Sequence, residues 1–267
     1  MSSGRSINDV PISKLGLAHY MRNYDELLGP MRQRPIKLLE LGIAEGDSLR
    51  RWAEWLPRAA VVGLDIRPRI AGLDSERIVT YQGEQQDTAL LDRIRREQAP
   101  DGFDVIIDDA SHVGQLTRLS FWHLYQHHLK PGGYYFVEDW GTGYWPQYVD
   151  GKTFQPREPA FLPRERVMNA LSQSALVRGN RLLRKAVGWI RWRAVKRSFP
   201  SHQRGMVGFI KELVDECGTA DITHPDFGTG NPRESRFEWM RLSLGHAIIK
   251  KPEADNAPSH VEGSPSK

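Results

Sequence analysis

Residues 36–48, IKLLELGIAEGDS, are the stretch that decides the fold. Its apolar run is typical of a buried strand, and the glycines Gly42 and Gly46 are typical of a tight turn into a helix. Strands that alternate with helices predict an α/β fold, a doubly wound and mainly parallel sheet with helices on both faces. Similar apolar runs follow at residues 59–66, 77–83, 103–111 and 132–140, with helix-length stretches at 47–56, 89–98 and 113–128.

The rest of the chain is assigned around this core. Residues 207–217 are predicted to form a further helix, and residues 239–250 a strand that closes the sheet. The tail is polar and rich in proline and serine, so we expect it to be disordered. The predicted organisation is an N-terminal lid segment at 1–30, a main domain at 31–250 with a helical insertion at about 160–204, and a tail at 251–267.

Composition excludes several classes of protein. The 267 residues include 37 Lys and Arg against 33 Asp and Glu, a formal charge of +4. No apolar run reaches the roughly 18 to 20 residues of a membrane span, and no hydrophobic stretch follows the first positive charges. The single cysteine, Cys217, excludes an intramolecular disulfide framework and a four-thiol zinc site. We therefore expect a cytoplasmic protein.

One segment is strongly basic. Residues 178–197 contain eight Lys and Arg and no acidic residue, with apolar residues interleaved at helical spacing. The plain interpretation is a surface or lid helix whose arginine stems cover apolar surface. The functional alternatives are a subunit interface, a membrane-surface contact for a lipid-linked substrate, and an RNA-binding patch.

Two strand ends carry the pattern of a nucleotide-type site. Residues 40–48 read ExGxxxGxS, which is neither the GxGxxG of dinucleotide binding nor the GxxxxGK[ST] of a phosphate loop. Asp65 ends the next strand, at the offset where a carboxylate can bind both hydroxyls of a ribose. Each glycine alone fits an ordinary turn. Together with Asp65, they favour a nucleoside cofactor bound by a carboxylate.

Acidic residues end two further strands. Asp108 and Asp109 follow one strand, Glu138 and Asp139 the next, and parallel strands bring such ends together. Crowded carboxylates raise the pKa of one member or require a cation, and oxygen donors suit Mg²⁺ better than zinc. His112 follows Asp109 by three residues, so one helical turn would place a general base beside the metal. The structural alternative is that Asp109 or Ser111 caps the next helix.

Four motifs, in order, carry a resemblance to a known family. KLLELGIAEGDSLRRWAEWLP, VVGLDIRP, FDVIIDDASH and LKPGGYYFVEDW resemble the class I S-adenosylmethionine-dependent methyltransferases, specifically the metal-dependent macrolide-type sugar O-methyltransferases of the cephalosporin-hydroxylase-like group. The resemblance covers about residues 14–145. It implies a Rossmann-like fold and an O-methyltransferase of class EC 2.1.1 that uses S-adenosylmethionine and Mg²⁺, or another divalent cation. The implied acceptor is a hydroxyl of a macrolide sugar, or of an oligosaccharide precursor of a polymethylated polysaccharide.

The resemblance also implies residue roles. We assign cofactor binding to Glu40, Gly42, Gly46, Ser48, Asp65, Gln86, Asp87 and Asp108, metal binding to Asp109, Glu138 and Asp139, and the catalytic base to His112. Lys14, His19, Tyr20 and Tyr24 are expected to close over the site, and Trp140, Tyr144, Trp145 and Tyr148 to face a sugar ring, with a packed aromatic cluster as the alternative. Ala110 departs from the glycine usual in relatives, and residues 146–204 do not match closely, so the acceptor is the least transferable part.

Three other functions compete with this interpretation. An RNA methyltransferase would explain the basic segment, but the [ND]PP[YF] signature of base-amino methylation is absent, so we expect no nucleic-acid partner. A cephalosporin-type hydroxylase would need an antiparallel double-sheet roll, which conflicts with the alternating pattern. A catalytically silent binding protein leaves the acidic residues and His112 unexplained. The expected partners are a small carbohydrate acceptor and further copies of the chain, in a dimer or tetramer.

Overall fold

The computed structural model describes residues 18–154 and 202–254, and between them residues 174, 179–180, 182–183, 185–187 and 189. The chain divides into two compact units, Met1–Lys152 with Arg204–Lys267, and Thr153–Gln203. Lys14, most of the predicted basic insertion and most of the predicted tail lie outside the described residues. Within the described part, no helix combines the length and apolar character needed to cross a membrane.

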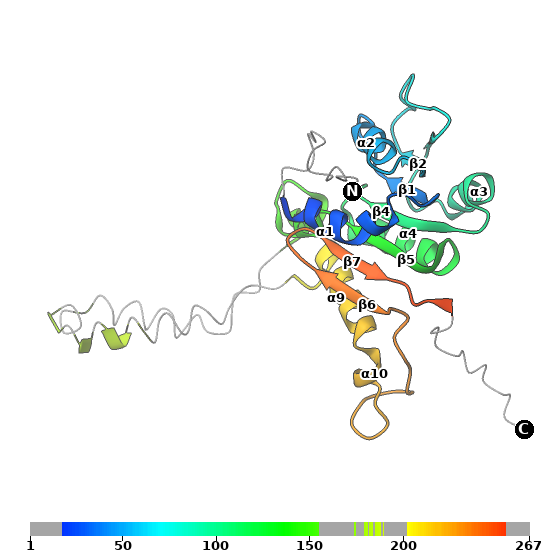
Figure 1. Ribbon diagram of the computed structural model, residues 1–267. Helices are drawn as coiled ribbons and strands as arrows, with labels where there is room; N and C mark the ends of the chain where they lie inside the picture. The colour runs from blue at the N-terminus through cyan, green and yellow to red at the C-terminus, as the bar shows by residue number, and fades with distance from the viewer. Residues whose placement is uncertain are drawn as a thin grey trace, which may run out of the picture. The chain divides into compact units, whose positions relative to one another are not determined.

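A seven-stranded sheet forms the centre of the first unit, in the order β3-β2-β1-β4-β5-β7-β6 (Figure 1). The first five strands are mutually parallel, and β7 and β6 are antiparallel to their neighbours. The predicted mainly parallel α/β sheet is therefore confirmed. The strands are β1 (Lys37–Leu41), β2 (Ala60–Asp65), β3 (Ile78–Gln82), β4 (Phe103–Asp108), β5 (Leu129–Val137), β6 (Trp239–Leu242) and β7 (Ala247–Lys250).

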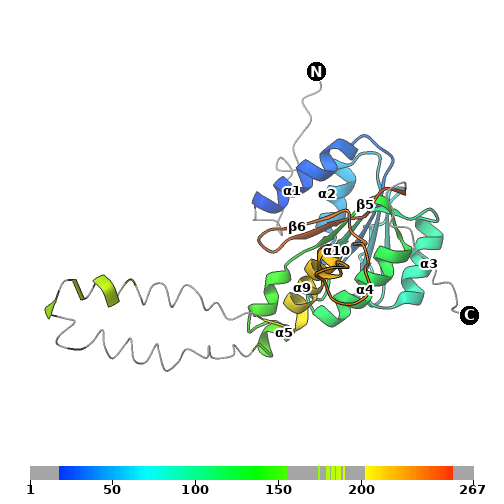
Figure 2. The same ribbon diagram turned by 90° about the horizontal axis from the view of Figure 1, so that it is seen from below.

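Helices cover both faces of this sheet (Figure 2). Leu38 of β1 packs into a core shared with α1 and α2, whereas Leu39 packs into a second core shared with α3, α4 and α9. Because both faces are covered, successive residues of the central strands are mostly apolar, which explains the nearly continuous hydrophobic runs in the sequence. The helices are α1 (Ala18–Leu28), η2 (Gly29–Met31), α2 (Asp47–Trp55), α3 (Thr88–Gln98), α4 (Gly114–His127), η3 (Trp140–Tyr144), α5 (Val149–Lys152), α9 (Gly205–Cys217) and α10 (Thr219–Ile222).

The predicted closing strand at residues 239–250 is instead a β-hairpin. Trp239 of β6 pairs with Lys250 of β7, and the Ser243 N–H donates to the His246 carbonyl at 2.8 Å across the turn. Gly245 has φ +66°, a left-handed conformation that glycine adopts at little cost. An unbroken strand of this length would also extend past the short strands beside it.

A buried carboxylate joins the starts of two helices. Asp150 Oδ2 accepts the Gly114 N–H at 2.8 Å and the Met206 N–H at 2.7 Å, at the first turns of α4 and α9. The residues that precede these helices, Val113 and Arg204, provide no side-chain cap. A carboxylate at a helix start satisfies free amides and interacts favourably with the helix dipole, so Asp150 caps both helices at once.

We expect Asp150→Ala to lower the free energy of unfolding by about 2 to 4 kcal/mol, because two capped amides lose their acceptor together. Asp150→Asn, which keeps a carbonyl oxygen, should cost less. Urea unfolding followed by circular dichroism measures both variants, with the exposed Asp101→Ala as the control. An unchanged unfolding midpoint for Asp150→Ala would show that these two bonds do not stabilise the fold.

Candidate functional site

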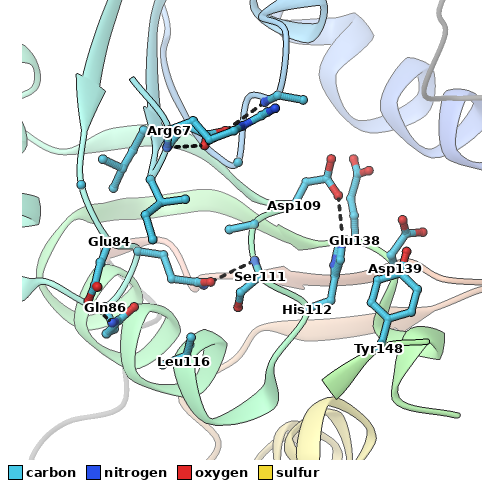
Figure 3. Close-up of a pocket in the computed structure, with 18 of the residues that line it drawn as sticks. Arg67, Glu84, Gln86, Asp109, Ser111, His112, Leu116, Glu138, Asp139 and Tyr148 are labelled. Atoms are coloured by element: carbon cyan, nitrogen blue, oxygen red, sulfur yellow. Dashed lines mark hydrogen bonds and ion pairs between the residues drawn. The ribbon is translucent and has the colours of Figure 1, made fainter. Parts of the chain in front are cut away.

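A cavity of about 660 Å³ opens at the carboxyl edge of the parallel strands, a size suited to a small organic ligand (Figure 3). Ala44, His112 and Asp139 line it and have φ values of +47°, +52° and +51°. Among the described residues they are the only non-glycine residues with positive φ. Such backbone strain concentrates at functional sites, because the surrounding structure has to hold it in place.

Asp65, at the end of β2, is the carboxylate at one end of the cavity. Its Oδ2 accepts the backbone N–H groups of Ile43 and Ala44 at 2.9 and 3.0 Å, and its Oδ1 accepts the Arg67 N–H at 2.9 Å. Although burial opposes the change, the bonds from Arg67 and from the two loop amides lower the pKa of Asp65 below its usual value. Asp65 is therefore an ionised acceptor, fixed against the glycine-containing loop. Gln86 lines the same end.

Gly42 lets two loops of the site meet. It has φ +83°, and a Cβ at this position would lie 2.2 Å from the Asp109 carbonyl oxygen. Any other residue would push the loop after β1 away from the loop after β4. Gly42 lines the cavity, whereas Gly46 does not. Gly46 instead adopts a left-handed conformation where α2 begins, with Leu73 packed where its Cβ would be.

The other end of the cavity holds the acidic residues (Figure 3). His112 Nε2 lies 3.7 Å from Asp109 Oδ1, and ligand atoms of Asp109, His112 and Asp139 all lie within 4.8 Å of one another. Glu138 lines the cavity beside them. This set combines carboxylate oxygens with one imidazole, and its spacing fits a single divalent cation.

Two tyrosines of α1 hold these carboxylates in place. The Tyr20 hydroxyl donates to Asp139 Oδ1 at 2.8 Å, and the Tyr24 hydroxyl donates to Glu138. Burial and the neighbouring carboxylates raise the pKa of both tyrosines, so each remains a proton donor. Tyr20 lines the cavity, whereas Tyr24 is fully buried behind Glu138. Tyr20 and Tyr24 therefore position carboxylates of the site. The predicted closing of the N-terminal segment over the site stays a prediction.

Glu138 lies in a strongly acidic environment. Burial, together with the charge of Asp109, raises the pKa of Glu138 well above its usual value. A carboxylate in this position either holds a proton or requires a nearby positive charge. A bound divalent cation would supply that charge and keep Glu138 ionised. Both the crowded negative charge and the spacing of the donor atoms therefore favour a bound cation at this end of the cavity.

The loop between β4 and α4 differs from the expected helical turn. Helix α4 begins at Gly114, and His112 has a left-handed backbone, so Asp109 and His112 approach one another across a loop. Ser111 does not cap the helix from its N-cap position, which Val113 occupies. Instead the Ser111 N–H donates to Gln85 Oε1 at 3.0 Å, and Ser111 Oγ accepts the Val113 N–H at 3.2 Å. These two bonds hold the loop in its strained form.

Several residues predicted to bind the cofactor do not line the cavity and have partners within the fold. Glu40 accepts the Trp52 indole N–H at 3.1 Å, and Asp87 caps α3 by accepting the Leu90 N–H at 3.1 Å. Asp108 is buried, and burial raises its pKa to about 7. The predicted residues outside the lining are Glu40, Gly46, Ser48, Asp87, Asp108, Tyr24, Trp140 and Tyr144.

Of the aromatic residues that follow β5, some line the cavity and others do not. Trp145 and Tyr148 line the cavity, and the Tyr148 ring meets the His112 ring edge-on at 5.7 Å. Trp140 packs against the core, and its indole N–H donates to the Ser243 carbonyl at 3.2 Å. The structural alternative, a packed aromatic residue, thus holds for Trp140. The side chain of His19 lies outside the described part of the structure.

Arg67 and Gln85 are among the lining residues that were not identified as site residues from the sequence. Arg67 lies two residues after Asp65 and pairs with both Asp65 and Glu45. Gln85 precedes the predicted Gln86, and its amide donates toward the buried Asp108 and Ser120. Their positions beside predicted site residues were the available signal, but only the fold shows that both residues line the cavity.

Curated proteins of similar sequence are O-methyltransferases. The mycinamicin VI 2''-O-methyltransferase of Micromonospora griseorubida is 39% identical over 153 residues, covering 54% of this chain and 37% of that protein. The demethylmacrocin O-methyltransferase of Streptomyces fradiae is 35% identical over 143 residues, covering 51% of this chain and 35% of that protein. Over about half of its length, the chain is similar in sequence to these O-methyltransferases. It spans little more than a third of the length of these curated relatives. No model of a protein family matches it.

A solved structure has the same fold. The MycE methyltransferase from the mycinamycin biosynthetic pathway, in complex with Mg and SAH, matches with a TM-score of 0.65 and 25% identity, over 98% of this chain and 59% of that one. Its complex with Mg, SAH and mycinamycin VI matches with a TM-score of 0.63. The fold is thus the Rossmann-like fold of class I methyltransferases, as the four sequence motifs predicted.

Proposed function

We propose that this chain is an S-adenosylmethionine-dependent and divalent-cation-dependent O-methyltransferase whose acceptor is a sugar hydroxyl of a small glycoside. One observation carries the proposal: a single cavity holds Asp65 at one end and Asp109, His112 and Asp139 at the other. The first end suits a ribose and the second a cation. The names of the curated relatives support O-methylation, and MycE was crystallised with Mg and SAH.

The residues of the cavity divide into three roles. Asp65 would accept hydrogen bonds from the ribose hydroxyls, with Gln86 near the base. Asp109, Glu138 and Asp139 would hold the cation through carboxylate oxygens. When bound, the sulfonium supplies the methyl group and the cation makes a coordinated hydroxyl more acidic. His112 would accept the hydroxyl proton at Nε2, which lies beside Asp109.

The strained loops contribute by positioning. His112 and Asp139 are both held in left-handed conformations, by the bonds of the loop after β4 and by Tyr20 respectively. Fixed side chains align the acceptor oxygen with the methyl group, and alignment provides much of the rate in a displacement of this kind. Trp145 and Tyr148 would offer flat faces to a sugar ring at the mouth of the cavity.

Two classes of acceptor fit this proposal. The relatives suggest a macrolide sugar, and an oligosaccharide precursor of a polymethylated polysaccharide is the alternative. The predicted basic insertion at residues 160–204 would contribute to acceptor binding. Most of this insertion, including most of the segment of the membrane-contact alternative, lies outside the described residues. The homo-oligomer stays a prediction.

Transfer of labelled methyl groups tests the function. The purified chain is incubated with labelled S-adenosylmethionine, Mg²⁺ and a panel of macrolide glycosides and mannose- or glucose-containing oligosaccharides, with the matching aglycones as controls. We expect label on a sugar hydroxyl, located by NMR, and loss of transfer in excess EDTA. Full turnover by metal-stripped protein would refute the metal requirement, and failure to bind S-adenosylmethionine by calorimetry would refute the enzyme class.

We expect Asp65→Ala to weaken S-adenosylmethionine binding about 10- to 100-fold, because hydrogen bonds from ribose hydroxyls to a carboxylate are lost. Mg²⁺ dependence should be retained, since the cation residues lie on other strands. Calorimetric titration with the cofactor measures the change. Asp65→Asn is the matched variant, because its amide oxygen can still accept from Ile43 and Ala44 and so separates loop order from ribose binding. Unchanged affinity in both variants would contradict the assignment.

A further inference from the structure

A second group of side chains that could hold a metal ion lies at the C-terminal end of α4, whereas the candidate active site lies at its N-terminal end. His123 Nε2 and His128 Nε2 each lie 2.8 Å from Asp92 Oδ1, and the two imidazole rings are 4.8 Å apart between centroids. Ligand atoms of all three residues lie within 4.8 Å of one another. Asp92 belongs to α3, His123 to the last turns of α4, and His128 directly follows that helix.

This group is separate from the candidate active site. The loop with Asp109 and His112 precedes the first residue of α4, and His128 follows its last residue. A helix of 14 residues is about 21 Å long. None of the three side chains lines the cavity at the carboxyl edge of the sheet. The proposed methyl transfer therefore gives them no role.

We propose that Asp92, His123 and His128 form a binding site for a late first-row transition-metal ion, with Zn²⁺ as the representative occupant. Two imidazoles and one carboxylate are a donor set that binds zinc, nickel or copper, whereas Mg²⁺ prefers oxygen donors alone. Three protein ligands leave one tetrahedral position for water or another small ligand.

The donor atoms converge on one point. The Nε2 atoms of His123 and His128 both face Asp92 Oδ1, so two nitrogen donors and one oxygen donor already surround a common centre. Metal ions bind the neutral imidazole and the carboxylate, which are the forms that these residue types offer.

The geometry needs only a small adjustment. Zinc binds nitrogen and oxygen at about 2.0 to 2.1 Å, which places tetrahedral donors about 3.4 Å apart. Asp92 Oδ1 would have to withdraw by about half an ångström from the 2.8 Å that separates it from each nitrogen. The Asp92 side chain is 45% exposed and can move, whereas His128 is 1% exposed and fixed by packing. Because Asp92 can move while His128 stays fixed, the three donor atoms can reach the spacing that a zinc ion requires.

Zinc titration of the whole protein tests the site. Calorimetry is carried out with Mg²⁺ in excess and in an Asp109→Asn background, so that the active-site carboxylates do not compete. We expect one bound Zn²⁺ and a higher melting temperature. His123→Ala and Asp92→Asn should weaken Zn²⁺ binding by about 100-fold or more, since even loss of an outer-shell partner costs 10- to 100-fold. Cobalt substituted for zinc should show the absorption of a tetrahedral ion.

The neighbouring histidine provides the matched control. His127 is exposed and is not one of the three ligands. Its ring lies near that of His123, with the centroids 5.3 Å apart and the planes tilted by 57°. His127→Ala should bind Zn²⁺ as tightly as its background. If His123→Ala and Asp92→Asn bind Zn²⁺ as tightly as the background protein, the proposal is overturned. The three side chains would then only join α3 to α4 by hydrogen bonds. A loss of Zn²⁺ affinity in His127→Ala as large as that in His123→Ala would also overturn the proposal, since surface histidines in general would then bind the ion.

Discussion

The Asp109→Asn variant is expected to lose methyl transfer by about 10³-fold or more, because a bound cation stabilises the reacting oxygen by several kcal/mol and each 1.4 kcal/mol is tenfold in rate. Asp109 lies at the centre of the acidic group: its carboxylate faces His112 and raises the pKa of Glu138. An amide keeps the shape of the side chain but removes its charge. Initial rates over a range of Mg²⁺ concentrations measure the effect.

The matched controls separate the cation from the fold. Asp101→Asn changes an exposed aspartate outside the cavity and should leave the rate unchanged. Calorimetry should show weaker Mg²⁺ binding by Asp109→Asn, with S-adenosylmethionine binding retained through Asp65. A variant that binds Mg²⁺ as tightly as the parent and transfers methyl groups at the parent rate would show that Asp109 is not a cation ligand.

Replacing His112 with alanine is expected to lower the rate about 10²- to 10⁴-fold, the usual contribution of general-base catalysis. The ring lines the cavity beside Asp109 and Tyr148, where it can reach an acceptor hydroxyl held by the cation. Because the role is in proton transfer, affinity for the cofactor and for Mg²⁺ should change little. Single-turnover rates and calorimetric titrations of the same preparation measure both quantities.

Two outcomes would change the mechanism. His112 also falls within the group of possible ligands formed with Asp109 and Asp139. If His112→Ala loses Mg²⁺ binding, the histidine is a ligand and not the base. If the variant keeps the parent rate, a carboxylate or the cation alone activates the hydroxyl. His224→Ala, at a partly exposed histidine outside the cavity, controls for the general effect of losing an imidazole.

The local pattern of the chain was sufficient for the fold. Apolar runs that end in turn residues predict strands wherever they occur, because hydrophobic burial and backbone geometry act over a few residues. The strands β1 to β4 and the helices α2, α3 and α4 lie within the ranges expected from those runs to within one residue, and β5 begins three residues before its expected start. The hairpin of β6 and β7 was missed, because its turn is marked by one glycine inside an otherwise extended pattern.

The parallel arrangement of the strands explains why part of the site could be predicted from the sequence. Asp65 ends one parallel strand and Asp109 directly follows another. Parallel strands end at the same edge of a sheet, so placing both residues at that edge requires no knowledge of side-chain packing. The same reasoning did not distinguish Asp109 from Asp108. Adjacent residues point to opposite sides, and only the packing of α4 decides that Asp108 is buried against Ser120.

The sequence by itself determined the parallel sheet, the cofactor-type loop after β1 and the acidic residues at one edge, because each depends on residue types at short spacing. Only the tertiary structure decided how those residues are held. Tyr20 bonds Asp139 over a separation of 119 residues, Gln85 bonds Ser111 over 26, and Asp150 accepts the Met206 N–H over 56. Contacts of this kind leave no periodic signal, because the fold brings the partners together from unrelated positions in the chain.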